Sequence, residues 1–496
     1  MAAPFRLYNT LTRSVEDFVP LREGHVGLYT CGMTVYDYQH VGHARAMVTF
    51  DMVARYLMHR GWIVEDVRNF TDVDDKIINR ARDNGEDPKA LADRFVVAFH
   101  DDVDKLGLRR PAHEPRVSES MPEILEVIQK LVDRGHAYVG EGSVWFDVAT
   151  FPEYGKLSRQ KLAELRGDEV GRGKRAAHDF ALWKAAKPGE PAWDSPWGKG
   201  RPGWHVECSA MAWMHLGETI DIHGGGLDLV FPHHENEIAQ SECAHGTKPY
   251  ARYWLHNGLL TLGGGQKMGK SLGNAFGIKE TLQLFPAEAL RLYYLQVHYR
   301  SPLPWSIDAL PDALALLARL YEAREQATQM AGDDPAERVA KQLGADAQRV
   351  VEFADGFTER FYAAMDDDFN TAKALGHAFE LARAVNRLSN HKLATKRGGP
   401  VARKALAAFQ VLEESLGLLR MSGAEFLEEV KTKRLPALGL TRAAVEAKLA
   451  ARNDARAAKD WTQADALRDE LEAAGIQVMD RADGVDWRVR LDAGEN

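Results

Sequence analysis

The chain has 496 residues, of which 45% are hydrophobic, and 63 Lys and Arg against 72 Asp and Glu give it a formal net charge of −9. This length and apolar content exclude a disordered or fibrous protein and predict about three domains. The three cysteines, Cys31, Cys208 and Cys243, are too few and too scattered for a disulfide framework, so we expect a reducing compartment.

The amino-terminal stretch interleaves charged and apolar residues, and no apolar run approaches the length of about 18 residues that a membrane span needs. We therefore expect an untargeted, cytoplasmic, soluble protein that makes no membrane contact. The negative net charge argues against a uniformly basic nucleic-acid binder. It leaves room for a local basic patch.

The first predicted elements form a strand, a loop, a helix and a second strand. A short apolar run covers residues 27–31, and apolar residues at helical spacing predict a helix over 44–60 that ends at Gly61. A second strand-like run covers 62–67. This order predicts a βαβ unit in a parallel sheet, whose ligands bind at the carboxyl ends of the strands.

The amino-acid composition changes twice along the rest of the chain. Residues 109–200 are rich in Pro, Gly and charge and are predicted to form an insertion between two halves of the sheet. Long amphipathic stretches rich in Ala, Leu, Glu and Arg begin near Pro304 and indicate packed helices. We predict an α/β fold with a Rossmann-type catalytic domain over 1–305, an α-helical bundle over 306–437 and a small mixed domain over 438–496.

A basic stretch lies within the predicted bundle. Its seven cations have no Asp or Glu between them in the sequence, and they are Arg383, Arg387, Lys392, Lys396, Arg397, Arg403 and Lys404. Either this stretch is a solvated helix face and loop, or it binds the phosphates of a nucleic acid. The lack of an acidic neighbour favours phosphate binding.

The last domain is predicted to contain two helices, over 441–458 and 461–474, and two short strands around Asp483-Gly484. Its small size suits an appended recognition module.

His40-Val41-Gly42-His43 is placed where the first loop becomes a helix. A helix amino terminus offers unpaired amides and a positive dipole end to a phosphate, two imidazoles add donors, and Gly42 lets a flat ring approach the backbone. These residues suit an ATP site. The alternative is that the two histidines only cap and decorate the helix.

A second phosphate-binding candidate is Lys267-Met268-Gly269-Lys270-Ser271, which follows three glycines. Two lysines on a glycine-rich loop can close over a triphosphate and neutralise the charge that develops on departing pyrophosphate. The segment from Gly264 to Ser271 also fits the phosphate-loop pattern of nucleotide hydrolases. Such a loop must run straight into a helix, whereas Gly273 and Gly277 interrupt the turns that follow.

Four residues are candidate metal ligands: Cys31, Cys208, His233 and Glu237. Pro232 at a helix start would place His233 and Glu237 one turn apart on the same face, and two thiolates, an imidazole and a carboxylate suit zinc. His234 or Glu235 can replace one of them in this pattern, and two core cysteines beside a polar helix start remain an alternative. Cys243 points elsewhere on its helix and is predicted to be a buried small residue.

Together these strings resemble the cysteinyl-tRNA synthetases, a class I aminoacyl-tRNA synthetase family, along essentially the whole chain. Further strings that carry the resemblance are Tyr8-Asn9-Thr10-Leu11, Cys31-Gly32-Met33-Thr34-Val35-Tyr36-Asp37, Asn69-Phe70-Thr71-Asp72, Pro202-Gly203-Trp204-His205, Asp221-Ile222-His223-Gly224-Gly225-Gly226, Phe231-Pro232-His233-His234-Glu235-Asn236-Glu237 and Asp366-Asp367-Asp368-Phe369-Asn370-Thr371.

The resemblance implies an enzyme that activates L-cysteine with ATP and Mg and joins it to tRNA(Cys). We expect a monomer. The resemblance also implies one zinc ion held by Cys31, Cys208, His233 and Glu237, to which the sulfur of the substrate adds as a thiolate. The implied amino-acid pocket contains Thr71, Trp204 and His223. The implied catalytic residues are His40, His43, Lys267 and Lys270, and those that bind ATP are Gly42, Asp228, Met268 and Ser271.

Two positions depart from the family pattern. Gly269 replaces the serine of the usual K-M-S-K-S string, which predicts slower or looser loop closure, and Leu227 replaces a small polar residue near the ATP contacts. The nearest alternative is a ligase that joins cysteine to an amino sugar in mycothiol synthesis, but such enzymes lack the anticodon-binding tail. A non-catalytic relative would be expected to lose a histidine, a lysine or a metal ligand, and none is lost here.

Overall fold

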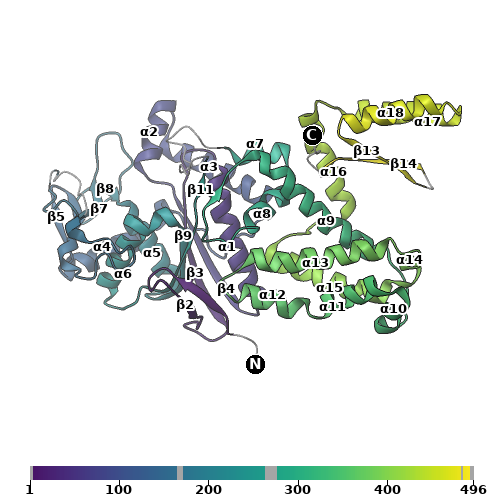
Figure 1. Cartoon of the computed structure of the whole chain (residues 1–496). Coiled ribbons are helices and arrows are strands. Elements are labelled where there is room, and N and C mark those ends of the chain that lie inside the picture. Colours follow the sequence, from purple (N-terminus) through teal and green to yellow (C-terminus); the bar gives the residue numbers. More distant parts are fainter. Residues whose placement is uncertain (1–3, 165–170, 172, 263–275, 482–483, 492–496) are drawn as a thin grey trace. The chain divides into compact units, whose positions relative to one another are not determined.

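The computed structural model describes residues 4–164, 171, 173–262, 276–481 and 484–491 (Figure 1). The chain divides into two compact units. Unit 1 contains Met1–Leu260, Tyr299–Leu303 and Asp366–Phe369, and unit 2 contains Thr261–His298, Pro304–Met365 and Asn370–Asn496. The domain limits expected from the sequence, at 305 and 437, stay predictions.

The helices and strands of unit 1 are, in chain order, β1 (Arg6–Asn9), β2 (Ser14–Asp17), β3 (His25–Thr34), α1 (Val41–His59), β4 (Ile63–Thr71), α2 (Asp75–Asn84), α3 (Pro88–Lys105), α4 (Met121–Asp133), β5 (Ala137–Gly140), β6 (Ser143–Phe146), β7 (Phe180–Ala185), β8 (Gly200–Pro202), α5 (Trp204–Leu216), β9 (Ile220–Gly226), α6 (Glu235–His245) and β10 (Ala251–Asn257). Two short strands, β11 (Leu260–Thr261) and β12 (Leu303–Pro304), each contain residues of both units.

The central sheet of unit 1 has the order β10-β9-β3-β4, and every neighbouring pair is parallel (Figure 1). The predicted βαβ unit is therefore confirmed, since α1 connects β3 to β4. β9 lies on the other side of β3, so the strand order reverses between β3 and β9. In open parallel sheets the crevice at the carboxyl ends of two such strands is where ligands bind.

Helix α1 begins three residues before the predicted start because His40 caps it. The His40 side chain accepts from the backbone amides of Gly42 and His43, and the His43 side chain accepts from the amide of His40, which forms a capping box. Val48, Val53 and Leu57 of this helix are fully buried, in agreement with the apolar spacing seen in the sequence.

The region predicted to be an insertion contains α4 and a second, antiparallel sheet of order β5-β6-β7-β8. The alternating inward residues of these strands, including Val144, Phe146 and Leu182, are fully buried in the core. The loop after β6 contacts α6, because the Glu235 carboxylate accepts from the backbone amides of Leu157 and Ser158.

Unit 2 is mainly helical. Its elements are α7 (Ile278–Leu284), α8 (Ala287–Leu295), α9 (Leu310–Gln329), α10 (Ala336–Leu343), α11 (Ala345–Asp355), α12 (Phe357–Met365), α13 (Thr371–Ser389), α14 (Ala394–Arg397), α15 (Gly399–Leu416), α16 (Gly423–Arg434), α17 (Arg442–Ala457), α18 (Trp461–Ala473), β13 (Ile476–Arg481) and β14 (Gly484–Val489). The predicted helical region and the terminal module of two helices and two strands are both observed.

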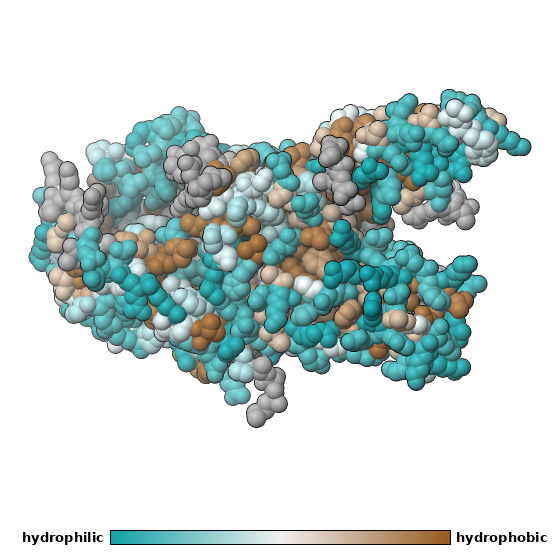
Figure 2. All heavy atoms as spheres, in the orientation of Figure 1, coloured by the Kyte–Doolittle hydropathy of each residue, from teal (hydrophilic) through white to brown (hydrophobic). Residues whose placement is uncertain are grey.

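The hydrophobic core of the terminal module is small. β13 and β14 pair antiparallel, and the few buried residues of its helices include Val445, Leu449 and Leu471. The surface over α17 and α18 is largely hydrophilic in Figure 2. Ion pairs connect α17 to β13 in this module. Both guanidinium amino groups of Arg452 lie 2.9 Å from the Asp480 carboxylate, which Arg456 also contacts.

The basic stretch is not as free of acidic partners as its sequence predicts. Arg397 lies 3.4 Å from Asp334, and Lys404 lies 2.5 Å from Asp355. Both acids come from other parts of the chain, which the local sequence could not reveal. The expectation of an unpartnered stretch is therefore wrong for these two cations.

None of the described helices combines the length with the hydropathy that crossing a bilayer requires.

Candidate functional site

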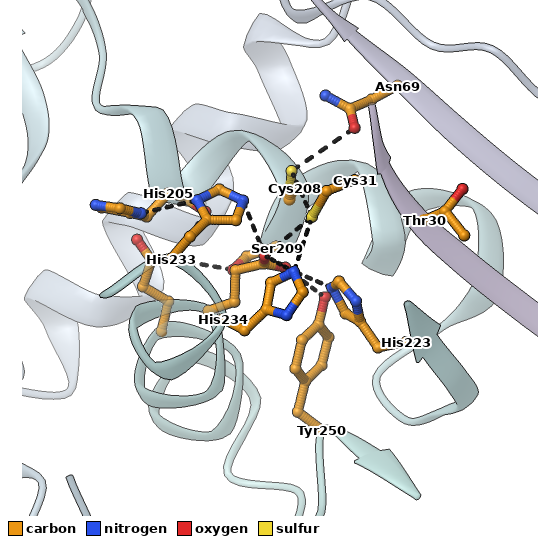
Figure 3. Close-up of polar contacts among 12 residues, drawn as sticks. Thr30, Cys31, Asn69, His205, Cys208, Ser209, His223, His233, His234 and Tyr250 are labelled. Atoms are coloured by element: carbon orange, nitrogen blue, oxygen red, sulfur yellow. Dashed lines mark hydrogen bonds and ion pairs between the residues drawn. The ribbon is translucent and has the colours of Figure 1, made fainter. Parts of the chain in front are cut away.

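The four predicted metal ligands converge at the carboxyl end of the parallel sheet. Figure 3 labels three of them, Cys31, Cys208 and His233. Cys31 comes from β3, Cys208 from α5, Glu237 from α6 and His233 from the turn Val230–His234 that precedes α6. One donor atom of each lies within 4.8 Å of the donor atoms of the other three. The arrangement can hold a metal ion.

A bulge in β3 aims Cys31 into this cluster. The pairing of β3 with β4 shifts register between Thr30 and Met33, and such bulges redirect a side chain. The backbone amide of Gly32 donates to Asn69 Oδ1 at 2.8 Å. A Cβ atom at Gly32 would lie 1.5 Å from the carbonyl oxygen of Asn69, so only glycine fits there.

The turn before α6 differs in one detail from the prediction. Helix α6 begins at Glu235, and Pro232 lies in the preceding turn, next to the non-helical Phe231. The predicted proximity is nevertheless observed, because His233 Nε2 lies 3.1 Å from Glu237 Oε1. Cys31 Sγ lies 3.8 Å from Cys208 Sγ and 3.5 Å from Glu237 Oε1.

A second group of donors shares Cys31 and Glu237 with the first. It adds His223 and His234, and His234 Nε2 lies 3.2 Å from Cys31 Sγ. His234 therefore remains an alternative ligand, as its sequence position allowed. Glu235 does not, because its carboxylate is engaged by the amides of the loop at 157–158.

Cys243 belongs to neither group. It is buried in the apolar core, as predicted, and burial raises the pKa of its thiol to about 12.

Several residues that sequence reasoning did not single out support the ligands. His205 Nδ1 lies 2.9 Å from His233 Nδ1, His256 Nε2 lies 2.8 Å from His234 Nδ1, and Tyr250 donates to Glu237 Oε2 at 3.2 Å. Asn69 Oδ1 lies 3.7 Å from Cys208 Sγ. Asn69 and His256 stand near the carboxyl ends of β4 and β10, a position that could have identified them.

The electrostatics favour the deprotonated form that a metal needs for two of the ligands, Cys208 and Glu237, whereas burial raises the pKa of Cys31 well above its usual range. A hydrogen bond from Cys31 lowers the pKa of Cys208 to about 6. Burial would raise the pKa of Glu237, yet the neighbouring His223 and His233 hold it well below its usual range. Burial opposes the charged form of His233, but the charge of Glu237 raises its pKa to about 10.

The predicted amino-acid pocket borders this cluster. His223 Nε2 lies 2.8 Å from Glu237 Oε2, and the ring of Trp204 stacks on that of His233 at 4.3 Å between centroids. The Thr71 hydroxyl donates to Glu207 Oε2 at 2.9 Å. Burial raises the pKa of Glu207.

His40, Gly42 and His43 lie together at the start of α1. The two imidazole rings stack at 3.6 Å between centroids, and a Cβ atom at Gly42 would lie 2.8 Å from Cε1 of His40. The flat ring that Gly42 admits is thus that of His40 itself. The histidines do cap the helix, and their ATP role stays a prediction.

The other predicted ATP contacts are less well defined. Asp228 lies in the short 3₁₀ turn Leu227–Leu229, directly after β9. Lys267, Met268, Lys270 and Ser271 lie outside the described residues, as does the whole phosphate-loop string that begins at Gly264.

Curated relatives match the chain from end to end. A protein of Geobacter sulfurreducens named cysteine–tRNA ligase is 50% identical over 494 residues, which cover 98% of this chain and 99% of that protein. The chain belongs to the cysteinyl-tRNA synthetase family. A cysteine–tRNA ligase of Methylococcus capsulatus is 49% identical over 488 residues, with 97% and 99% of the two chains covered.

Three family descriptions match in succession along this synthetase-family chain. They are the class I (C) tRNA synthetase catalytic domain at 17–315, the DALR domain at 360–420 and the cysteinyl-tRNA ligase anticodon binding domain at 440–488.

Solved structures agree on the fold. The Mycobacterium tuberculosis methionyl-tRNA synthetase bound by methionyl-adenylate has a TM-score of 0.59 at 14% identity, with 84% of this chain and 95% of that chain covered. A leucyl-tRNA synthetase from Agrobacterium radiobacter, solved as a ternary complex with tRNA, has a TM-score of 0.57 at 11% identity, with 84% and 86% covered.

Proposed function

We propose that this protein activates L-cysteine with ATP to cysteinyl-adenylate and transfers the cysteinyl group to the 3′ end of tRNA(Cys). The observation that carries the proposal is the convergence of half-buried Cys31 with buried Cys208, His233 and Glu237 at the carboxyl end of the sheet. The anticodon binding domain at 440–488 supports tRNA as the acceptor and argues against an amino sugar.

The ligand distances support zinc as the metal. Tetrahedral zinc with Zn–S bonds of about 2.3 Å separates two sulfurs by about 3.8 Å and a sulfur from an oxygen by about 3.5 Å. The corresponding distances here are 3.8 Å between Cys31 and Cys208 and 3.5 Å between Cys31 and Glu237. The group that contains both thiols is therefore the better zinc site, and His223 is left for the amino-acid pocket.

Zinc gives this pocket a preference for a soft thiolate over a neutral hydroxyl. Shape alone separates substrates as similar as cysteine and serine by only about 10- to 200-fold. Discrimination by a metal makes an editing site unnecessary, and we propose none.

The side chains act mainly by positioning and by charge stabilisation. The substrate carboxylate attacks the α-phosphorus of ATP in line, so no general base is needed. Thr71, Trp204 and His223 hold the amino acid, and His40, His43, Lys267 and Lys270 stabilise the triphosphate. Gly42, Asp228, Met268 and Ser271 complete the contacts to ATP and its Mg.

The three predicted domains divide this work. We assign activation to 1–305, with its insertion at 109–200, contact with the tRNA stem to 306–437 and anticodon binding to 438–496. The enzyme acts as a cytoplasmic monomer in this proposal.

Exchange between pyrophosphate and ATP, measured without tRNA, tests the proposal together with the metal content. We expect exchange that depends on cysteine, no exchange with serine, and about one zinc per chain, in keeping with a single four-ligand site. Removal of the metal by a chelator should abolish the preference for cysteine. Equal exchange with serine would contradict the zinc-based selection.

A further inference from the structure

A small pocket of unit 1 lies beside the His40–His43 segment and has no part in the proposed mechanism. Its volume is about 230 Å³, and it is formed by the end of β3, the loop that follows and α3. Pockets for drug-sized ligands have volumes of about 300–1,000 Å³, so this pocket suits a smaller group such as one planar ring system. Its apolar lining includes Met33, Val35, Phe95 and Phe99.

Gln39 contributes an unpaired amide to the lining of this pocket. Only 5% of Gln39 is exposed, and among the described residues neither its amide oxygen nor its amide nitrogen has a hydrogen-bond partner. A buried polar group without a partner destabilises the free protein, and such groups are rare. The position of Gln39 therefore points to a ligand that supplies both a donor and an acceptor.

The neighbours of Gln39 restrict the chemistry of that ligand. Asp37 and Asp102 also line the pocket, and Asp102 is only 6% exposed, so a phosphate or a carboxylate would meet charges of its own sign. The ring of Tyr38 meets that of Phe95 edge to face at 5.2 Å between centroids and is 55% exposed. An exposed aromatic ring offers a face on which a flat ligand can stack.

These features match a nucleobase, which is flat, uncharged and rich in donors and acceptors along its edges. Proteins recognise unpaired bases by stacking them on aromatic side chains and by hydrogen bonding to their edges. A glutamine amide pairs with adenine through two hydrogen bonds, since its oxygen accepts from the exocyclic amine and its nitrogen donates to a ring nitrogen. Adenine is therefore the base that Gln39 fits best.

The pocket lies between the amino-acid pocket of the proposed function and the start of α1. The backbone amide of Val35 donates to the carbonyl oxygen of Thr71 at 3.1 Å, and Thr71 belongs to that amino-acid pocket. Gln39 directly precedes His40, which caps α1. An acceptor that takes the activated amino acid must reach this part of the protein.

The implied ATP contact Asp228 is on the other side of β3 from the pocket. Phe99 of α3 packs on Phe70 of β4 at 4.9 Å between centroids, and β4 is one neighbour of β3. Asp228 directly follows β9, which is the other neighbour of β3. The pocket therefore suits an adenine other than that of ATP.

We infer that this pocket binds the adenine of the unpaired 3′-terminal adenosine of tRNA, with Gln39 pairing with the edge of the base and Tyr38 stacking on its face. The inference rests on the proposed function, in which the 3′ end of tRNA(Cys) receives the cysteinyl group. ATP carries the same base, and the experiments below distinguish the two sources.

The first test is Gln39→Met, which replaces the amide with an apolar chain of similar length. We expect the KM for tRNA(Cys) in charging to rise about 10- to 100-fold, the value of one two-bond contact to a base. Cysteine-dependent exchange, which proceeds without tRNA, should keep its KM for ATP and for cysteine. The Tm should not fall, because the variant removes a buried amide that has no partner among the described residues.

The second test changes the RNA instead of the protein. A tRNA(Cys) whose 3′-terminal base is purine lacks the exocyclic amine of adenine. With the unmodified protein its KM should rise by a factor close to that of Gln39→Met with ordinary tRNA. Combining the variant with the modified tRNA should add little further loss, because both changes remove the same contact.

Two further variants complete the design. Tyr38→Ser should raise the KM for tRNA about 10-fold through lost stacking, and it decides the question if Gln39→Met does not fold, because Tyr38 is largely exposed. Gln296→Met is the matched control. Its buried amide nitrogen also has no partner among the described residues, but Gln296 belongs to unit 2. We expect it to leave the KM for tRNA unchanged.

The inference is overturned if Gln39→Met leaves the KM for tRNA unchanged, or if its effect and that of the modified tRNA simply add. A higher KM for ATP in exchange would assign the pocket to the adenine of ATP. A lower Tm with equal losses in exchange and charging would make Gln39 a purely structural residue. Failure of the proposed function looks different, because the unmodified protein would then show no cysteine-dependent exchange.

Discussion

The metal-ligand group and the basic stretch place their charged residues in opposite ways. Cys31 and Cys208 are 177 residues apart in the chain, yet their sulfurs lie 3.8 Å apart beside buried His233 and Glu237. The basic stretch is continuous in the sequence, but Arg397 and Lys404 pair with distant acids. Buried polar groups are expensive to gather, whereas exposed ion pairs contribute about 0–1 kcal/mol. Convergence in the interior is therefore the stronger indication of function.

The largest expected effect is loss of a thiol from the metal-ligand group. Cys208→Ser should reduce metal content to near zero, and cysteine-dependent exchange should fall more than about 100-fold, because losing a ligand exceeds the 10- to 100-fold effect of losing a supporting contact. Atomic absorption and exchange kinetics measure both. Cys243→Ser is the matched control, since Cys243 is buried outside the group. Full metal occupancy in Cys208→Ser would remove the contrast between the two regions.

A smaller effect is expected when a residue that contacts a metal ligand, but is not itself a ligand, is replaced. His205→Ala removes the ring that lies 2.9 Å from His233 Nδ1 and should weaken metal affinity about 10- to 100-fold, because such contacts fix the orientation of a ligand. Competition with a chelator gives the affinity. His136→Ala is the control, since the His136 ring contacts Thr150 in the insertion. Equal affinities in the two variants would show that His233 needs no orienting partner.

The basic stretch is tested by charge reversal. Among the described residues no ion pair is found for Arg387 or Lys396, so the double variant Arg387→Glu, Lys396→Glu should reduce tRNA charging several-fold and flatten its salt dependence by about one unit of slope per lost phosphate contact. Cysteine-dependent exchange should be unaffected. The paired cations serve as the comparison in Arg397→Glu, Lys404→Glu, for which we expect a smaller loss. Unchanged charging in the first double variant would mean that the stretch is only solvated.

The smallest effect concerns the terminal module. Hydrogen bonding to Arg452 lowers the pKa of Asp480 to about 2. A depressed carboxyl pKa contributes stability above its unfolded value of about 3.9, and this contribution is lost as the pH falls through the folded value. Asp480→Asn should therefore destabilise the module at neutral pH by at most about 1 kcal/mol, since the pair is partly exposed to solvent. Thermal unfolding at pH 7 and pH 3 should show a difference at pH 7 that shrinks at pH 3.

Much of the fold could be predicted because its signals are local. The βαβ unit, the helical region and the terminal module follow from periodicity and from glycine stops. The start of α1 was predicted three residues too late, although the capping of this helix by its histidines was the alternative that the sequence left open. The acidic partners of Arg397 and Lys404 were missed because only the folded chain brings them close.

The candidate site, like the fold, could be predicted from the sequence only where the signal is local. The identities of Cys31, Cys208, His233 and Glu237 came from residue chemistry and resemblance, whereas their convergence depends on the register of β3 and on the turn before α6. Tyr250 and Glu207 lie in no string that marked them, and His205 lies in one that gave it no role of its own. They are recognised only by distances across the interior, such as the 2.9 Å between Thr71 and Glu207.

The bulge at Gly32 constrains how this pocket can be redesigned. Ligands on helical faces can be exchanged one side chain at a time, but the direction of Cys31 is set by two main chains that nearly touch at Gly32 and Asn69. An engineer who wants another amino acid accepted should therefore vary α5 and α6 and keep residue 32 as it is. Any larger residue there would force β3 and β4 apart and carry the sulfur of Cys31 out of reach of the other three donors.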